Sequence, residues 1–532
     1  MHPVALVDIV VRGLTHDAEE ALERLLREGD ADDESVLAGA TFLRVLTCRF
    51  DEALDTALVL TTSDDRPSLL AKAAADLAIA VCAGLPASDL DADTGDGPLA
   101  ELTAMLEVEA AMSSGLIDVA SRIAGRIVSR HGVRTATGTW SALALARARG
   151  FEGRLVEADE LVDRVLSAAE TRTRPQLHLL AQGARIFVDG HLGRSDAVEA
   201  GVDTLLDECP DVVEHDYVLA GALVLAAFGT NASGRLPEAS ELILLGGGGE
   251  HLPHLQIVDR VYGYEMLVED ALARQDLAAA HDWAEHAEGL PVAGHPLAAA
   301  ALGRIRARVA LALADTDSGI RESAGSGRLA ALVGSDLEVI RARVIESSAR
   351  AASGDRVRGI EELEEVARRA GEVGAASVKA WVDRELRAYG RRLRNVPGHG
   401  WDGLTEPQQA IARLAAAGLR NREIAAAMWI AEKTVESHVA AVLTALGTTN
   451  RVGIGRVLGG TGVDPQFGRD LTARQREVAV LVAGGRSNQE ISVELGISEK
   501  TVEKHVAGLF DRLGVRTRAA IAACVRGEPL EP

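Results

Sequence analysis

Two lysines, a glutamate and a histidine lie close together in a helix predicted over residues 499–506. The segment reads Glu-Lys-Thr-Val-Glu-Lys-His-Val and places Lys500, Glu503, Lys504 and His505 at exposed positions. A lysine ammonium can donate to O6 and N7 of guanine, and a carboxylate can accept from N4 of cytosine. A helix with this face is shaped for the major groove of DNA. These residue types are therefore chemically suited to contact with nucleic acid.

The residues before this helix predict two further helices that must hold it. The predicted N-terminal caps of the three helices are Thr472, Ser487 and Ser498. Ser487 also forms a capping box with Glu490, Gly484-Gly485 ends the first helix, and Gly496 supplies the positive φ of a tight turn. The predicted inward-facing residues are Val478, Leu481, Val482, Ile491, Leu495 and Val502. Together these features predict a helix-turn-helix.

Residues 471–521 resemble the DNA-binding domain of the LuxR family of bacterial transcription regulators. The motifs LT-x-R-x-R-E-V, G-x-S-N-x-E-I, L-G-I-S-x-K-T-V-E-x-H and L-G-V-x-x-R appear in order and without gaps. The resemblance implies that Glu503 and Lys504 read bases. It also implies phosphate contacts, at Lys500, Thr501, His505 and Arg518. A buried structural role for His505 is the alternative to its phosphate contact.

A second copy appears 67 residues earlier, over residues 404–454, again without gaps. The residues repeated between the copies are, in the earlier one, Leu404, Thr405, Gly418, Asn421, Glu423, Ile424, Ile430, Lys433, Thr434, Val435, Glu436, His438, Leu446, Gly447 and Arg451. The domain is therefore duplicated. The positions equivalent to the candidate DNA-binding residues are Lys433, Thr434, Glu436 and His438.

The earlier copy differs from the later one at residues that cap helices, form the turn or carry charge. Arg420 replaces the capping Ser487, and Ala431 replaces the capping Ser498. Each lost cap should cost about 1 kcal/mol. Trp429 stands in place of Gly496, which costs on the order of 1 to 2 kcal/mol unless the turn changes shape. Ser437 replaces Lys504, which removes a cation. We expect this copy to bind DNA weakly, or to dock against its twin or a second subunit.

The short flexible linker over residues 459–465 would keep the two units close to each other. Once one unit is docked, the other meets DNA at an effective concentration of order mM. The pair could then read an inverted site within one chain. The alternative is a homodimer that pairs through the helix after Arg518, over residues 519–526, which is the usual dimer element in relatives.

The first 400 residues show an internal repeat of about 40 residues. Each unit has a polar or glycine turn followed by a helix that opens with acid and alanine. Turns are predicted at Gly115, Gly153, Gly193, Gly234, Gln275, Asp315 and Gly354, with an earlier one near Arg49. An antiparallel helix pair of this length cannot bury its apolar stripe alone, so the pairs must stack. The pattern resembles the tetratricopeptide class with a longer period, and predicts a curved solenoid with a long concave face.

Charge separates the two parts of the chain. Residues 401–532 hold 16 Lys and Arg against 15 Asp and Glu, a formal +1, whereas the whole chain has −23, which leaves −24 for residues 1–400. An acidic body would repel a polyanion, so the C-terminal part is expected to meet it. Hydrophobic residues make up 47% and aromatic residues 3%, which favours packed helices over β-sandwiches.

The residues that several classes of protein function require are absent from this sequence. No lysine follows a glycine, so the Walker A loop of the large ATP-binding LuxR-type regulators, which the chain otherwise resembles, is absent. Four scattered cysteines with no C-x-x-C pair offer no zinc ribbon or disulfide framework. No nucleophile, metal or phosphate-loop constellation indicates an enzyme. We expect no cofactor, no metal and no membrane span.

The predicted fold class is all-α, a helical-repeat (tetratricopeptide-like) solenoid followed by two helix-turn-helix domains. The predicted domains are 1–395 (solenoid), 396–458 (first helix-turn-helix), 459–465 (linker) and 466–532 (second helix-turn-helix). The predicted function is a cytoplasmic, nucleoid-associated regulator that binds double-stranded DNA. It is expected to activate transcription with RNA polymerase, controlled by a ligand or protein on the solenoid. The alternative is a protein-interaction scaffold whose helix-turn-helix units pair with other regulators without binding DNA.

Overall fold

The structure is a computed structural model in two compact units, Met1–Arg392 and Leu393–Pro532. It describes all residues except 31–32, 63–66, 88–89, 91–96, 169–170, 172, 210–215, 392–403, 405, 417–418, 429, 447–450, 452–453, 455–470, 484–485, 496, 514, 516 and 527–532. The described residues form helices joined by turns, which confirms the all-α class. No described helix has the length and apolar character needed to cross a bilayer.

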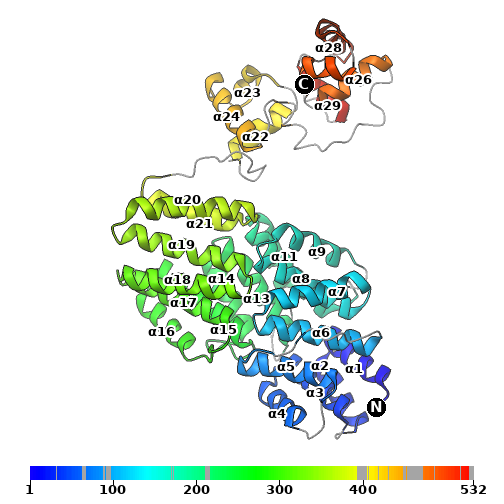
Figure 1. Cartoon of the computed structure of the whole chain (residues 1–532), viewed down its shortest axis with the longest axis vertical. Coiled ribbons are helices and arrows are strands. Elements are labelled where there is room, and N and C mark those ends of the chain that lie inside the picture. Colours follow the sequence, from blue (N-terminus) through cyan, green and yellow to red (C-terminus); the bar gives the residue numbers. More distant parts are fainter. Residues whose placement is uncertain are drawn as a thin grey trace. The chain divides into compact units, whose positions relative to one another are not determined.

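The first unit is built from antiparallel helices stacked in chain order (Figure 1). Its helices are α1 (Pro3–Thr15), α2 (Ala18–Glu28), α3 (Glu34–Leu46), α4 (Phe50–Thr62), α5 (Leu69–Ala83), α6 (Pro98–Ser113), α7 (Ile117–His131), α8 (Ala136–Phe151), α9 (Leu155–Ser167), α11 (Pro175–His191), α12 (Ser195–Glu208), α13 (Tyr217–Ala232), α14 (Leu236–Gly247), α15 (Ile257–Ala273), α16 (Leu277–Glu288), α17 (Pro296–Ala312), α18 (Thr316–Leu332), α19 (Asp336–Ala352), α20 (Arg356–Glu372) and α21 (Ala376–Ala388). The predicted solenoid is confirmed.

The turns of the repeat each contain a residue whose backbone adopts the left-handed conformation, at the end of alternate helices. Positive φ occurs at Gly115 (71°), Gly153 (78°) and, without glycine, Ala314 (62°). At each of these turns the next residue donates its N–H to a carbonyl five residues back, as Leu116 does to Ala111 at 2.9 Å. This bond satisfies a carbonyl that the end of the helix leaves free. The turns therefore lie where the 40-residue repeat predicts them.

Alternate helices differ in burial, and this sorts them into two layers. Nearly every residue of α6, α8 and α13 is buried, whereas α7, α9 and α12 bury one stripe each. A helix that is apolar on all sides belongs in the interior, and one with a single stripe belongs at the surface. The first set forms an inner layer that the second set covers.

The solenoid also coils back on itself, which the sequence did not predict. His295 Nε2 lies 2.7 Å from the carbonyl oxygen of Ser113, and Ser335 donates its hydroxyl to the carbonyl of Phe151 at 3.0 Å. Both contacts join residues more than 180 positions apart, with separations of 182 and 184. Successive turns of the first half thus meet successive turns of the second.

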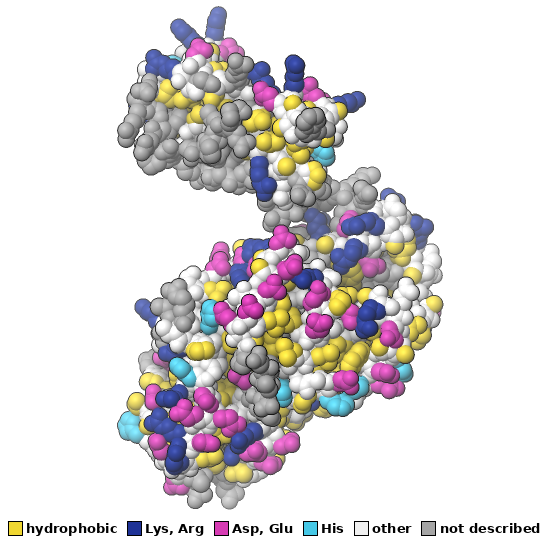
Figure 2. Space-filling model, turned by 180° about the vertical axis from the view of Figure 1, so that it is seen from behind, with side chains coloured by type: hydrophobic (Ala, Val, Ile, Leu, Met, Phe, Trp, Pro, Cys, Tyr) yellow, Lys and Arg dark blue, Asp and Glu magenta, His cyan; other side chains and the backbone are white. Residues whose placement is uncertain are grey.

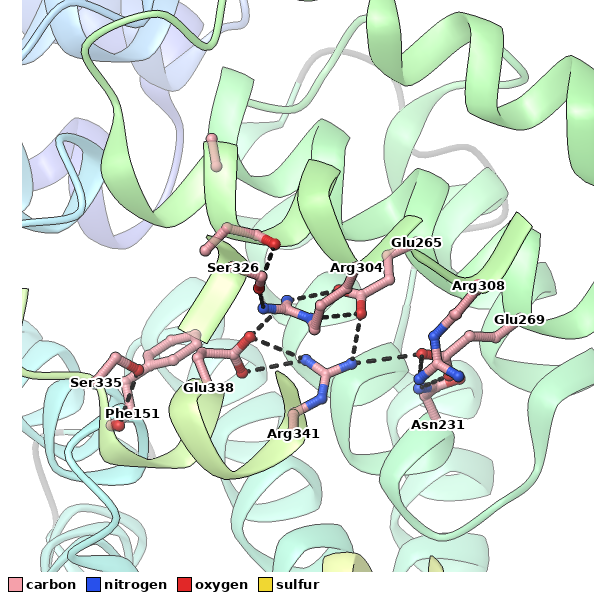
Figure 3. A network of polar contacts seen from close by, with 12 residues as sticks. Phe151, Asn231, Glu265, Glu269, Arg304, Arg308, Ser326, Ser335, Glu338 and Arg341 are labelled. Carbon is pink, nitrogen blue, oxygen red and sulfur yellow. Dashed lines mark hydrogen bonds and ion pairs between the residues drawn. The ribbon is translucent and has the colours of Figure 1, made fainter. Parts of the chain in front are cut away.

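A buried ion network ties three inner helices together (Figure 3). Arg304 on α17 has no exposed side-chain surface and pairs with Glu265 on α15 at 2.7 Å and Glu338 on α19 at 2.5 Å. Arg341 bridges the same two carboxylates, each at 3.1 Å. Burial alone would raise the pKa of Glu265, but Arg304 and Arg341 hold it well below its ordinary value. The charges are buried as a compensating network, so losing one member leaves one buried charge uncompensated.

The second unit holds two short helical bundles of the same pattern. The first contains α22 (Glu406–Ala416), α23 (Asn421–Met428) and α24 (Glu432–Ala445). The second contains α26 (Ala473–Ala483), α27 (Asn488–Leu495), α28 (Glu499–Leu513) and α29 (Arg518–Arg526). Each bundle has its own apolar core. The tandem helix-turn-helix arrangement is therefore present in the described residues.

Close packing of α11 against α13 depends on glycine. A Cβ built at Gly229 would lie 2.0 Å from the carbonyl oxygen of Ile186, whereas one at Gly221 on the same helix would meet nothing nearer than 3.8 Å. We expect Gly229→Ala to destabilise the first unit by about 1 to 3 kcal/mol. Gly221→Ala should stabilise it by about 0.5 to 1 kcal/mol. Chemical unfolding followed by circular dichroism measures both, and equal effects would contradict the packing described.

Replacing Arg304 should show how much the buried ion network contributes to the free energy of unfolding. Arg304→Ala is expected to cost about 3 to 5 kcal/mol, because Glu265 and Glu338 then share Arg341 and one buried negative charge is left uncompensated. The matched control is Arg306→Ala on the same helix, which breaks an exposed pair with Glu288. An exposed pair contributes about 0 to 1 kcal/mol. Unfolding by urea compares the two variants, and a similar loss for both would show that the network is not effectively buried.

Candidate nucleic-acid interface

Helix α28 is held in its bundle by one apolar stripe. Val502, Val506 and Leu509 are buried against the helices that precede it. This confirms Val502 as a core residue. Because these residues share one side of a helix, the opposite side faces outward. Lys500, Glu503 and Lys504 are exposed there, and Thr501 and His505 are partly buried.

The outward charged side chains of α28 do not pair with other described residues. Among the described residues, none pairs with the side chain of Lys500, Glu503, Lys504 or His505 through a hydrogen bond or ion pair. In the first unit, by contrast, arginines lie interspersed with acids and many form ion pairs. Figure 2 shows this difference, with Lys and Arg side chains projecting from the second unit. Charges without internal partners are available to a ligand.

The predicted caps are in place. The Thr472 hydroxyl accepts from the Gln475 N–H at 3.3 Å, and the Ser487 hydroxyl accepts from the Glu490 N–H at 3.2 Å. Glu490 in return accepts from the Ser487 N–H at 2.7 Å, which completes the capping box. Ser498 accepts from the Thr501 N–H at 3.2 Å, and the two hydroxyl oxygens lie 2.8 Å apart. The Thr501 hydroxyl therefore already takes part in the start of α28.

Arg518 acts within the bundle in a way that the sequence did not predict. Its two terminal nitrogens donate to Oδ1 of Asn488 at 2.7 Å and to the carbonyl of Arg486 at 2.6 Å. The guanidinium therefore fastens the start of α29 to the start of α27. A phosphate contact by Arg518 would have to share these donors. Sequence comparison of the two copies offered a signal, because both Asn and Arg recur in each.

The earlier copy repeats this geometry position by position. Arg451 donates to the carbonyl of Leu419 at 2.7 Å and to Asn421 at 2.6 Å, as Arg518 does 67 residues later. The buried residues shared by the two cores are Leu404, Ile411, Ala412, Ala415, Ile424, Val435, Val439, Val442 and Ile454, each with its counterpart 67 positions on. The duplication is thus one of structure as well as sequence.

The capping losses in the earlier copy are visible. Glu423 accepts from the Arg420 N–H at 2.6 Å, so half of the capping box remains. Arg420 has no hydroxyl to return the bond, and Ala431 has none to cap α24. The helix nevertheless forms over Glu432–Ala445. Apolar packing therefore supports α24 with less help from its terminus.

The outward face of α24 resembles that of α28 but has one lysine fewer, because Ser437 stands where the later copy has Lys504. Lys433, Thr434 and Glu436 are exposed, and His438 is partly buried. Sequence reasoning counted Ser437 as the loss of a cation but passed over Arg422, which is exposed on α23 where the later copy has Gln489. Aligning the two copies with an offset of 67 residues shows that Arg422 corresponds to Gln489.

Some predicted features fall outside the described residues. These are the glycines Gly484-Gly485 and Gly496, Trp429 in the earlier turn, and the linker over residues 459–465. Within the described part of the chain, no group of three or more His, Cys, Asp or Glu side chains could hold a metal ion.

Comparison with known proteins agrees with this geometry. Residues 402–458 and 469–525 each match the family described as bacterial regulatory proteins, luxR family. Among similar proteins, the probable transcriptional regulatory protein SgaR of Hyphomicrobium methylovorum is 45% identical over 53 residues, which cover 10% of this chain and 25% of that protein. An uncharacterized transcriptional regulatory protein of Bacillus subtilis, YhcZ, is 49% identical over 55 residues, or 10% and 26%. The matches thus span about a quarter of these relatives.

A much longer relative matches over a similar stretch. A putative HTH-type transcriptional regulator of Mycobacterium bovis is 36% identical over 63 residues, which cover 12% of this chain and 7% of that protein. What the relatives share with this chain in these matches is a segment the size of one helix-turn-helix domain.

The caps offer a reciprocal test of the two copies. Ser498→Ala should loosen the first turn of α28 by about 1 kcal/mol, because a helix N–H loses its acceptor. Ala431→Ser should tighten α24 by a similar amount. Amide hydrogen exchange of the full chain, read by mass spectrometry, should show faster exchange at residues 499–502 in the first variant and slower exchange at residues 432–435 in the second. Unchanged exchange in both would contradict the capping roles.

Proposed function

We propose that this chain, which carries two tandem helix-turn-helix domains of the luxR family, is a DNA-binding transcriptional regulator. The observation that supports this is the face of α28, where the side chains of two lysines, a glutamate and a histidine pair with no residue that the structure describes. The relatives named above are transcriptional regulators or putative ones, which points the same way. We place its action on chromosomal DNA in the cytoplasm and propose no enzymatic role.

In this proposal α28 enters the major groove of double-stranded DNA. Glu503 and Lys504 contact base edges, which suits their exposure and lack of partners. Lys500, Thr501 and His505 contact phosphates, which position the helix without reading sequence. Arg518 supports the interface chiefly by holding α29 against α27, and any phosphate contact by it is secondary.

We propose a lesser role for the earlier copy. Lys433, Thr434, Glu436 and His438 on α24 would contact DNA after the later copy has docked, because tethering raises the local concentration. The missing caps at Arg420 and Ala431 weaken its helices, whereas Arg422 supplies a replacement cation. Loss of binding should therefore be smaller for Lys433→Ala than for Lys504→Ala, and equal losses would contradict this ranking.

The remaining parts of the proposal concern control. The acidic first unit would sense a ligand or a protein and govern the DNA-binding units, with activation through RNA polymerase as the output. A homodimer is the proposed assembly on a two-fold site. Buried Ala520, Ile521 and Val525 show that α29 already packs inside its bundle, so a dimer contact would use its remaining face.

A mobility-shift assay tests DNA binding with the full chain. Selection from a random duplex library first supplies a preferred site, and a scrambled duplex serves as reference. Lys504→Ala and Glu503→Gln should each weaken binding to the preferred site by about 5- to 150-fold, the equivalent of 1 to 3 kcal/mol, and should relax selectivity. Arg358→Ala, an exposed arginine of the first unit, is the control and should bind as the unchanged chain does.

Salt dependence distinguishes the regulator from a protein-interaction scaffold. Phosphate contacts release counterions, so affinity must fall steeply as salt rises. Failure to enrich any duplex, together with unchanged self-association in the Lys504→Ala variant, would favour the scaffold and contradict the proposal.

A further inference from the structure

A cavity of about 560 Å³ lies inside the first unit, beside the buried ion network. Its wall is shared by α11, α13, α15, α17, α19 and α21. The volume falls in the range that holds small organic ligands. The inner helices of the solenoid and its last helix therefore line one cavity that is open to solvent on one side.

Most charges in the wall are already neutralised. Arg341 and Arg308 line the cavity, and both pair with Glu269, at 3.5 and 2.6 Å. Arg341 also pairs with Glu265, which Arg304 holds from behind (Figure 3). Three arginines thus balance the three carboxylates of this network, Glu265, Glu269 and Glu338. The network fixes the shape of the wall and leaves no net charge for a ligand.

Two adjacent charged residues of α21 do not belong to this ion network. Arg384 lines the cavity, is exposed, and pairs with no described residue. Glu385 also lines the cavity, but its two oxygens accept from neutral donors, Trp381 Nε1 at 3.1 Å and the Ser348 hydroxyl at 3.0 Å. The cavity therefore offers one uncommitted positive group and one carboxylate without a cation.

The rest of the wall combines apolar surface with unsatisfied polar atoms. Phe228 and Met266 are apolar, and Trp381 carries Arg308 over its ring at 4.8 Å. The hydroxyl of Tyr262 and Oδ1 of Asn231 are buried and have no hydrogen-bond partner in the structure. Buried polar atoms without partners are unfavourable. A ligand with N–H or O–H groups would relieve this.

His191 adds a fixed acceptor to the wall. Its Nδ1 lies 2.8 Å from the carbonyl oxygen of Phe187, which can only accept, so the proton resides on Nδ1. Burial lowers the pKa of His191 to about 4, so the ring is neutral at physiological pH. Its Nε2 is then an acceptor and has no partner among the described residues.

We propose that this cavity binds a small zwitterion with an apolar body, the chemical class of the apolar amino acids. The ligand carboxylate pairs with Arg384, its ammonium pairs with Glu385, and its side chain lies against the apolar wall near Phe228 and Met266. A purely anionic ligand would leave Glu385 facing a like charge, and a purely cationic one would leave Arg384 without a partner. The site accommodates both charges together.

Such a ligand would join α21 to the inner helices α13 and α15. Helix α21 is the last helix of the first unit, and the chain continues from it to the helix-turn-helix domains. A ligand bound there would therefore contact the helix through which the first unit connects to those domains. This consequence rests on the proposed function, whereas the binding site itself does not.

The test is thermal unfolding of the full chain with each proteinogenic L-amino acid at millimolar concentration. At least one apolar amino acid should raise the Tm by about 2 to 4 °C. Its N-acetyl and methyl ester forms, which remove one charge each, should raise it far less. Arg384→Ala should weaken binding about tenfold or more, measured by calorimetry, because a charge-assisted contact is lost. Arg387→Ala on the same helix, which breaks an exposed pair with Asp383, is the control and should bind normally.

The outcomes separate this site from the proposed function. Absence of a Tm shift with every amino acid, equal shifts with the N-acetyl or ester forms, or full binding by Arg384→Ala would each overturn the zwitterion site. Arg384 pairs with no residue in the described part of the chain, so an unchanged Tm without amino acid shows that the variant folds. A mobility shift without amino acid tests DNA binding separately, and its failure alongside a clear Tm shift would reject the regulator while leaving the site in place.

Discussion

An isolated helix cannot bury its own apolar stripe. In both units of this protein, the helices bury these stripes by packing against one another. In the first unit, helices pair and stack until an inner layer is buried on nearly all sides. In each helix-turn-helix domain, a few valines and leucines hold the third helix against its two predecessors. Function depends on what remains after this burial. The face of α28 that packing leaves outward is the face that carries unpaired charge.

Local features of this fold could be predicted from sequence because they depend on near neighbours. Caps at Ser487 and Ser498, the core position of Val502 and the turn at Gly153 each follow from residues within one or two helical turns. The duplication was also visible, because 67-residue spacing needs no structure to detect. Contacts between distant residues were not predictable. The contact of His295 with Ser113 depends on the accumulated curvature of the intervening helix pairs. Arg518 was assigned a phosphate contact by resemblance, whereas its hydrogen bonds to Asn488 and Arg486 become visible only when α27 and α29 are side by side.

Ion pairs occur in both units, but among the described residues only those of the first are fully buried. There arginines pair with acids even where Arg304 is completely buried. In the second unit Arg474 pairs with Glu477 nearer the surface, whereas Lys500 and Lys504 on α28 are exposed and pair with no described residue. A net charge of −23 for the whole chain therefore says little about the charges that the helix-turn-helix domains expose. Among the charged residues that line the cavity, Arg384 and Glu385 form no ion pair with described residues. Both lie on α21, the last helix of the first unit. The proposed ligand site and the connection to the helix-turn-helix domains therefore share this helix.

The central claim is that α28 contacts bases through Glu503 and Lys504. Genome-wide chromatin capture of the tagged full chain tests it most directly, comparing the unchanged protein with a variant carrying Glu503→Lys and Lys504→Glu. This double change keeps the net charge, so a difference in occupancy reports base contacts more than general attraction to DNA. The account predicts that the original sites lose occupancy in the variant. Occupancy of the same sites at the same level would contradict it.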